Sequence, residues 1–401
     1  MQDTLHNPEL VRPTRLPRYL LPKVYYFCHF AAMAALMPFL ALYYRELGLS
    51  ERHIGLLTGL PPLLTLVVAP LWGALADATQ RHQRLLQTAV GGLWVTILLL
   101  SLLRNPFWLF PVVVLYATFS APIMPLVDNT VLALLGERKA IYGRLRLWGA
   151  LGWGIAGTAA GLLIERFGLD WAFYGALFFL AGCLLAALRL HVQQVQIGQP
   201  FWQGMRFFVT SRPWLVFLVT LFLNGVAAGV SNNFLFLYLD ELAASKSLMG
   251  ATLLVATVSE VPIFFFGDRL LNRLGARGLL LLSLSASVVR MTAYALMPAA
   301  WYVLPINLLH GLTFSAMWVA GVSYANRAAP LGMGATAQGL LSGVSMGLAG
   351  AIGAVTGGYL YEAVGPAATF GWAGACVACG LLFFAVAGQR ARDIQMTSYR
   401  P

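Results

Sequence analysis

Residues 161–173 read GLLIERFGLDWAF, and residues 358–370 read GYLYEAVGPAATF. Gly, Glu, Gly and Phe stand at matching places in the two stretches, with a constant offset of 197 residues. A glycine-rich apolar run precedes each copy, and small residues of this kind let helices approach closely. This recurrence predicts a chain built from two repeated halves.

The composition indicates a membrane protein. Hydrophobic residues make up 59% of the 401 residues, charged residues make up 10%, and the mean hydropathy is +0.74. A soluble domain carries about 25% charged residues, so this chain has too few charges to cover a soluble surface. Apolar runs of about 20 residues, the length that crosses a bilayer, recur throughout. We place membrane-spanning helices at 22–46, 52–76, 85–103, 108–134, 143–165, 170–190, 213–239, 248–268, 278–298, 301–327, 334–361 and 366–388.

These twelve spans predict three regions. They are an N-terminal six-helix bundle (1–190), a cytoplasmic linker with a short amphipathic helix (191–212), and a C-terminal six-helix bundle with a short cytoplasmic tail (213–401). Most of the 26 Lys and Arg residues fall on one side of this topology, the side of both termini. By the positive-inside rule, both termini are cytoplasmic and the protein lies in the inner membrane. The net charge of +11 would suit a nucleic-acid partner, but its distribution over the loops on one side of the membrane argues against one.

Few ionisable residues remain at bilayer depth. They are Asp128, Glu260, Arg290 and the weaker base His310, and such residues usually face a cavity and pair with one another. At a rise of about 1.5 Å per residue, Glu260 and Arg290 lie close to the midplane, so we expect them to form an ion pair beside His310. Asp128 and Arg146 should meet on neighbouring antiparallel helices. The alternative is that the Glu260–Arg290 pair only fastens two helices together.

The loop after the second span carries a recognisable pattern. Residues 73–84 read GALADATQRHQR, with Gly73, Asp77 and Arg81 in the spacing G-x-L-x-D-x-x-x-R. This resembles the loop signature of the major facilitator superfamily, and twelve spans in two repeats strengthen the resemblance. It implies an all-α membrane fold of two six-helix pseudo-repeats around a midplane solute site. It also implies that Gly73, Asp77 and Arg81 form a gating loop.

A closer resemblance covers nearly the whole chain. Residues 121–153, anchored by YGRLRLWGALGW at 142–153, are similar to the lactose permease and phenylpropionate permease group of proton symporters. The resemblance implies substrate-binding roles for Asp128, Arg146 and Trp153. The residues that fall on its proton-coupling network are Glu260, Arg290 and His310.

The chain departs from that group at several charged positions. Thr313 stands where lactose permease has an acid, and Asn307 falls at about the place of a lysine. Asn232 and Asn233 lie in the region of two acids, and we predict that they contact substrate. Four aromatic residues are further candidates for the cavity, although packing would explain each of them: Tyr25, Phe27, Phe236 and Trp318.

Together these features predict a secondary active transporter that moves a small organic solute by alternating access, with proton symport. The solute is a sugar or glycoside, a nucleoside or an aromatic acid. An exporter working as a proton antiporter and an uncoupled facilitator stay open as alternatives. We expect a monomer in the lipid bilayer that binds a small molecule and protons and has no enzymatic activity, metal or cofactor. The pair Cys376 and Cys379 is expected to pack between helices.

Overall fold

The structure is a computed structural model, and it describes residues 19–135, 141–190, 207–330 and 333–397. Every secondary-structure element in this part of the chain is a helix. The helices of the N-terminal half (N-half) are α1 (Leu20–Glu46), α2 (Glu51–Thr79), α3 (His82–Leu102), η1 (Pro106–Trp108), α4 (Leu109–Ser120), α5 (Ile123–Leu135), α6 (Tyr142–Phe167) and α7 (Asp170–Arg189). The helices of the C-terminal half (C-half) are α9 (Arg212–Glu241), α10 (Lys246–Phe265), α11 (Gly267–Ala295), η3 (Ala300–Tyr302), α12 (Val303–Asn307), η4 (Gly311–Ser315), α13 (Ala316–Ala328), α14 (Gly334–Ser342), η5 (Gly343–Leu348) and α15 (Ala349–Thr397). The linker predicted at 191–212 falls mostly outside the described residues.

These helices agree with twelve membrane spans. Ten of the described helices are long and apolar enough to cross a membrane, and the bent pair Ala300–Asn307 and Gly311–Ala328 makes an eleventh. One of the ten, Thr336–Ala387, has 52 residues. It would be about 78 Å long if straight, more than twice a hydrocarbon thickness of about 30 Å. It breaks at Gly365, whose φ of 79° lies in the left-handed region, and so it holds the last two predicted spans.

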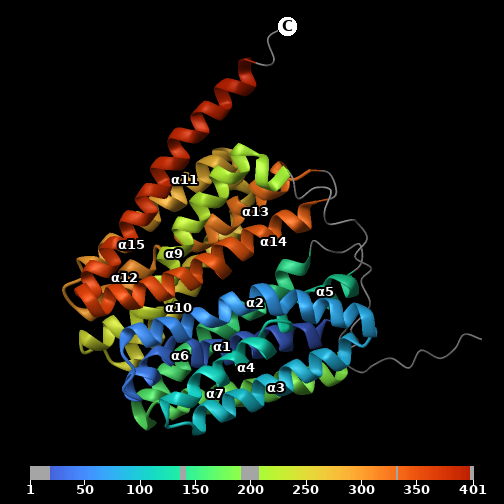
Figure 1. Cartoon of the computed structure of the whole chain (residues 1–401), viewed down its shortest axis with the longest axis vertical. Coiled ribbons are helices and arrows are strands. Elements are labelled where there is room, and N and C mark those ends of the chain that lie inside the picture. Colours follow the sequence, from blue (N-terminus) through green and yellow to red (C-terminus); the bar gives the residue numbers. More distant parts are fainter. Residues whose placement is uncertain (1–18, 136–140, 191–206, 331–332, 398–401) are drawn as a thin grey trace, which may run out of the picture.

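The helices form two bundles that lie side by side (Figure 1). The helices α1–α7 make up one bundle, and α9–α15 make up the other. The bundles meet mainly through three helix pairs, α1 with α9, α2 with α15 and α6 with α10. Helices from equivalent places in the two repeats therefore form the boundary at which a solute site would lie.

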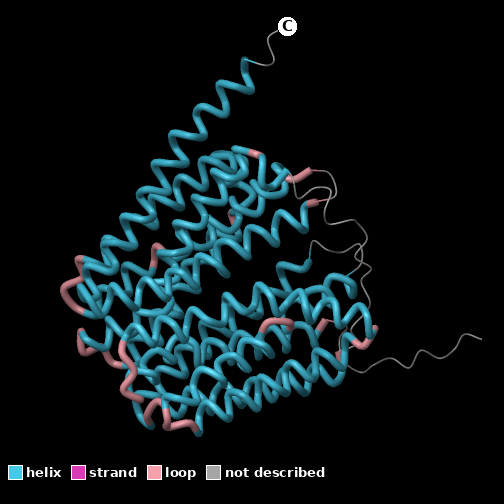
Figure 2. The backbone as a smooth tube through the Cα atoms, in the orientation of Figure 1, coloured by secondary structure: helices cyan, strands magenta, loops and turns pink. Residues whose placement is uncertain are grey.

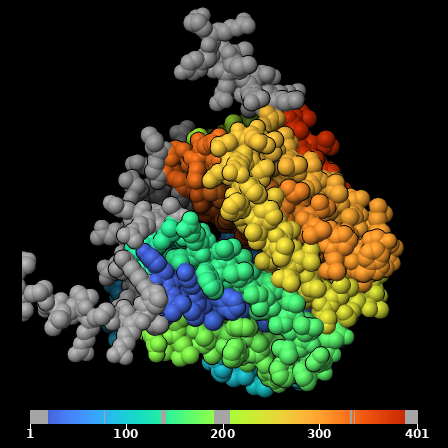
Figure 3. Space-filling view, turned by 180° about the vertical axis from the view of Figure 1, so that it is seen from behind, coloured from blue at the N-terminus to red at the C-terminus, as the bar shows by residue number. Residues whose placement is uncertain are grey.

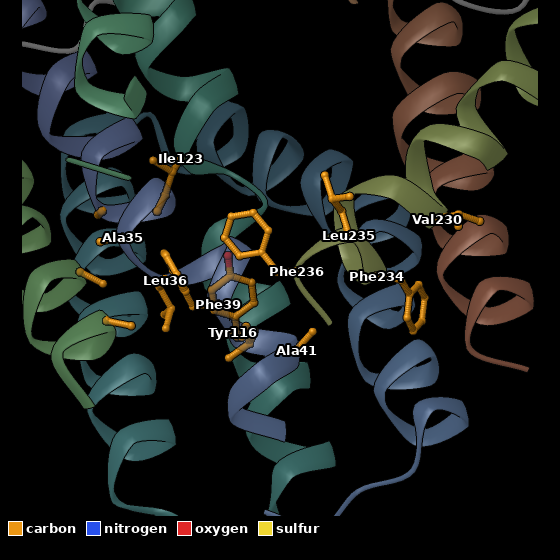
Figure 4. Packing of buried hydrophobic residues seen from close by; sticks show 14 of the residues in the cluster. Ala35, Leu36, Phe39, Ala41, Tyr116, Ile123, Val230, Phe234, Leu235 and Phe236 are labelled. Carbon is orange, nitrogen blue, oxygen red and sulfur yellow. The ribbon is translucent and has the colours of Figure 1, made fainter. Parts of the chain in front are cut away.

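Apolar side chains pack across this boundary. The rings of Phe39 on α1 and Phe236 on α9 meet edge to face, with 5.1 Å between their centroids (Figure 4). Both residues are buried, and this geometry is the favourable one for aromatic pairs. Phe236, which the sequence suggested as a cavity residue, thus helps to hold the halves together.

Ion pairs join the halves at one end of the bundle. We call this the distal end, and it is the end at which α1 stops and α2 begins. Arg45 pairs with Glu241 at 2.8 Å, and Arg52 pairs with Glu362 at 3.1 Å. Tyr361 donates a further hydrogen bond to Glu241 at 2.9 Å. Within the described residues, the ion pairs between the halves both lie here.

Two repeat-related glutamates each cap a helix of the opposite half at this end. Glu165, in the last turn of α6, accepts hydrogen bonds from the backbone N–H groups of Lys246 and Ser247, where α10 begins. Glu362 of α15 accepts one from the backbone N–H of Arg52 in the first turn of α2, at 3.2 Å. A carboxylate at this position satisfies free N–H groups and interacts well with the helix dipole. We call these contacts the Glu165 latch and the Glu362 latch.

A glycine lies one turn before each glutamate. A Cβ atom on Gly161 would lie 2.5 Å from the carbonyl oxygen of Lys246, and one on Gly358 would lie 2.4 Å from that of Glu51. No side chain fits at that separation, so the helices cross at backbone contact. The 197-residue recurrence therefore marks two equivalent crossings that close the distal end.

The bundles separate toward the opposite, proximal end. Figure 2 shows that the two sets of helices diverge in that direction. Figure 3 shows a hollow between the N-half and the C-half on one face. Within the C-half, an open groove of 460 Å³ lies beside α13 and is lined by Leu271, Trp318, Asn326 and Arg327. The described part of the molecule is thus closed at its distal end and open at its proximal end.

Candidate functional site

The first candidate cluster lies in the N-half, where α1 meets α5 and α6. Tyr26 of α1 donates its hydroxyl hydrogen to Asp128 of α5, with 2.5 Å between the oxygens. The guanidinium of Arg146 on α6 lies 5.3 Å from the centre of the Tyr26 ring and 4.2 Å from that of Phe30. Tyr142, in the first turn of α6, interacts with both Tyr26 and Asp128. Cation–π contacts of this kind hold an arginine while leaving its N–H groups free.

The expected direct contact between Asp128 and Arg146 is wrong for this structure. The two residues form no ion pair, and Tyr26 links them instead, through its hydroxyl on one side and its ring face on the other. Tyr26 and Phe30 lie one helical turn apart and therefore share a face of α1. The Arg146 side chain makes no hydrogen bond to another residue that the structure describes. Its planar fork of donors is therefore available to a ligand.

The other predicted substrate-binding residues lie apart from this cluster. Trp153 is half-buried, two turns from Arg146 along α6, and its side chain forms no hydrogen bond or ring contact within the described part of the chain. Asn233 uses its amide on the carbonyl of Gly229 in its own helix, at 2.7 Å, and Asn232 is exposed on α9. No described contact joins either asparagine to Asp128 or Arg146.

The second cluster lies in the C-half. Glu260 of α10 and His310 lie within hydrogen-bond distance, with 3.1 Å between Oε1 and Nε2. Both side chains are mostly shielded, and Nδ1 of His310 is buried without a hydrogen-bond partner among the described residues. The ring of His310 stacks on Phe314, which in turn stacks on Trp318. This row of rings runs from the Glu260–His310 contact to Trp318, which lines the groove beside α13.

Arg290 has neutral partners, which corrects the prediction of a Glu260–Arg290 ion pair. The Arg290 guanidinium donates to Asn307 Oδ1 at 2.7 Å, to Thr313 Oγ1 at 3.1 Å and to the Tyr294 hydroxyl at 3.1 Å. Tyr294 also donates to Asn307 Oδ1 at 2.9 Å. Only 8% of Arg290 is exposed, so these oxygens replace water around a buried cation. The charge of Arg290 still acts on His310.

The chain's departures from the lactose permease pattern explain this cage of neutral oxygen atoms around Arg290. Asn307 and Thr313, which stand near the places of a lysine and an acid in that permease, both bind Arg290. They come together because the chain bends by 45° between α12 and the helix that follows, and because residues 311–315 form a π-helical turn. Such turns change the direction of side chains and often occur at functional sites.

The predicted gating loop lies at the proximal end. Gly73 is part of α2, and Arg81 is exposed between α2 and α3. The Arg81 side chain forms no hydrogen bond or ion pair within the described residues. The side chain of Asp77 falls outside the described residues. A lock between this loop and its neighbours stays a prediction.

Sequence reasoning missed three aromatic partners of the two arginines. It named Tyr25 and Phe27 on α1, but the structure uses Tyr26 and Phe30. It also passed over Tyr294, one turn beyond Arg290. Helical spacing could have indicated both groups. Tyr26 and Phe30 are four residues apart, as are Arg290 and Tyr294, and residues four apart share a helix face.

The comparisons with known proteins bear on the whole chain. A family model described as "MFS_1 like family" matches residues 19–372. The maltose permease of Geobacillus stearothermophilus is 33% identical over 374 residues, which cover 92% of this chain and 94% of that protein. A probable 3-phenylpropionic acid transporter of Escherichia coli is 28% identical over 358 residues, 85% of this chain and 90% of that protein. A crystal structure of the nucleoside transporter NupG superposes with a TM-score of 0.80 at 16% identity, over 93% of this chain and 99% of that chain, and shows the same fold.

Proposed function

Since this chain belongs to the MFS_1 like family of the major facilitator superfamily, we propose that it is a proton-coupled transporter of small organic solutes. It lies in the cytoplasmic membrane with both termini inside, works as a monomer, and uses the proton gradient in place of a cofactor. The distal end faces outward, so the structure is a state open to the cytoplasm. The two halves rock about the solute as the latches open and the proximal end closes.

The observation that carries proton coupling is the Glu260–His310 pair beside Arg290. Arginine keeps its proton under all ordinary conditions, so Glu260 and His310 are the groups in this cluster that can exchange one. A proton on Glu260 weakens its contact with His310 and leaves the charge of Arg290 without a nearby anion. The stability of the cluster then depends on proton occupancy, and this links the proton to the preferred state of the protein.

The solute binds in the N-half cluster. Arg146 presents unused donors and Asp128 presents acceptor oxygens, while Trp153 offers a ring face without a described partner. A solute with a ring and several oxygen atoms can use all three. Sugars, nucleosides and aromatic acids share these features, in keeping with the names of the relatives.

Reconstituted vesicles test the proposal. We expect an imposed pH gradient to drive accumulation of at least one of maltose, uridine and 3-phenylpropionate, and a proton ionophore to abolish it. Glu260→Gln should stop accumulation and retain counterflow exchange. Asp268→Asn is the matched control, because this exposed acid lies at the start of α11, outside the cluster.

If the Glu260→Gln variant still accumulates solute, a group other than Glu260 carries the coupling. If solute only equilibrates across the membrane, at a rate that the ionophore does not change, the protein is an uncoupled facilitator. Extrusion driven by inward proton flow would identify an antiporter.

A further inference from the structure

Each half of the molecule holds an acid, an arginine and a histidine on its helices. In the C-half these are the Glu260–His310 pair and Arg290. In the N-half these are Asp128, Arg146 and His29 of α1. His29 is buried, with 6% of its surface exposed. Like Nδ1 of His310, Nδ1 of His29 is buried and has no hydrogen-bond partner within the described residues.

Aromatic rings connect His29 to the arginine of the candidate solute site. Its ring lies parallel to that of Tyr25, with 6.3 Å between centroids, and meets Phe30 edge-on at 5.4 Å. Phe30 also contacts the Arg146 guanidinium, 4.2 Å from the ring centre. The charge of Arg146 acts on His29. One phenyl ring therefore connects a buried imidazole to the arginine.

The charges around His29 balance while its ring is neutral. The titratable groups on the neighbouring helices are Arg146 of α6, Asp128 of α5 and Cys183 of α7, whose thiol donates to the backbone carbonyl of Tyr25. Tyr25 and Tyr26 lie on α1 itself. Asp128 and Arg146 carry one charge of each sign, so a proton on His29 would add a positive charge that no further acid among these groups balances. An unbalanced buried charge is costly.

We propose that His29 is a second proton-binding residue, which takes up a proton on its imidazole ring when a solute brings a negative charge to Arg146. The proton comes from water, and no other bond forms or breaks. A carboxylate on Arg146 offsets the added charge, so the proton and the anion each favour the binding of the other. An uncharged solute gives no such linkage. The inference rests on the proposed function, because it takes Arg146 as the solute-binding residue.

Counterflow exchange in vesicles at equal pH on both sides tests this linkage. We use 3-phenylpropionate and maltose as probes between about pH 5.5 and 8, where an imidazole titrates. For the wild type, the half-saturating concentration of 3-phenylpropionate should fall by up to about tenfold per pH unit on acidification, the limit for one linked proton. That of maltose, which is linked only to the proton on Glu260, should change less.

His29→Gln should reduce the pH dependence for 3-phenylpropionate to that for maltose and leave exchange at high pH intact. His29→Asn, which keeps an amide group near Nδ1, should do the same. Tyr25→Phe is the control and should keep the dependence, since the Tyr25 hydroxyl has no hydrogen-bond partner among the described residues. The proposal is overturned if 3-phenylpropionate still shows a stronger pH dependence than maltose in both histidine variants. Equal dependence for maltose overturns it as well.

A second measurement observes His29 directly. In histidine-labelled protein, the imidazole signal missing from the His29→Gln variant should move toward the protonated position when 3-phenylpropionate is added at constant pH. A signal that does not move contradicts the proposal, whatever the transport assay gives. Accumulation driven by a pH gradient, with its Glu260→Gln control, reports separately on the proposed function.

Discussion

Tyr26 donates a 2.5 Å hydrogen bond to Asp128 while the face of the same ring lies under Arg146. The tyrosine thus positions the acid and the arginine of the N-half together. It also keeps them from neutralising each other directly, so both remain able to bind a ligand.

Tyr26→Phe should weaken solute binding without disrupting the fold. The ring and its contact with Arg146 remain, but Asp128 loses a charge-assisted hydrogen bond, worth about 1.5–3 kcal/mol. We expect the half-saturating concentration in counterflow to rise about tenfold or more, with a small fall in melting temperature. Tyr25→Phe is the matched control, because its hydroxyl has no described partner. Equal effects of the two substitutions would contradict the role given to Tyr26.

Trp153→Ala should lower affinity and leave stability nearly unchanged. The Trp153 side chain has no ring contact or hydrogen bond within the described residues, so its loss removes little from the fold. An aromatic stacking contact is worth about 0.5–1.5 kcal/mol, which predicts a loss of affinity of roughly two- to tenfold. Transport kinetics and thermal unfolding measure the two effects. A large fall in melting temperature with unchanged affinity would show that Trp153 serves packing.

Removing the two latches should open the distal end. Helix capping contributes about 0.5–2 kcal/mol per cap, so Glu165→Ala and Glu362→Ala should each favour the outward-open state modestly, and the double variant more. Spin labels at Phe167→Cys and Ala243→Cys, in protein without the native cysteines, measure this opening. The distance between them should be longer in each single latch variant than in the wild type, and longest in the double variant.

The control for the latches is Asp170→Asn. Asp170 pairs with Arg104 at 3.4 Å at the same end, but within the N-half, so its loss should leave the label distance unchanged. The idea fails if the double latch variant gives the wild-type distance.

Asn307→Asp should stabilise the protein and impair its cycle. The substitution places a carboxylate at the atom that now accepts from Arg290 at 2.7 Å, and a charge-assisted bond is roughly twice as strong as a neutral one. The new ion pair offsets Arg290 independently of Glu260. We expect a higher melting temperature and loss of uphill accumulation. Unimpaired accumulation would show that the charge of Arg290 plays no part in coupling.

The large-scale architecture could be predicted from sequence because it depends on properties that add up along the chain. Apolar length placed the spans, and the recurrence of Glu165 and Glu362 identified the two halves. The partners of Arg290 could not be predicted, because they depend on rotation and bending. Depth alone made Glu260 its expected partner, but the bend before η4 brings Asn307 and Thr313 closer.

The burial of His29 could not be predicted from the sequence for a different reason. His29 lies in the proximal part of α1, and its place in the sequence does not show that it is buried. Its burial results from the packing of Tyr25 and Phe30 around it, and composition carries no information on that packing.

The neutral oxygen cage around Arg290 also sets how transport responds to voltage. Because the arginine charge is fixed and its ligands are uncharged, each proton that Glu260 carries adds one whole charge to the moving complex. Moving one charge through 100 mV is worth about 2.3 kcal/mol. Uptake of an uncharged solute with one proton should therefore generate a current and accelerate as the cell interior becomes more negative. A monocarboxylate that enters with protons on both Glu260 and His29 should generate the same current, and one that enters with a single proton should generate none.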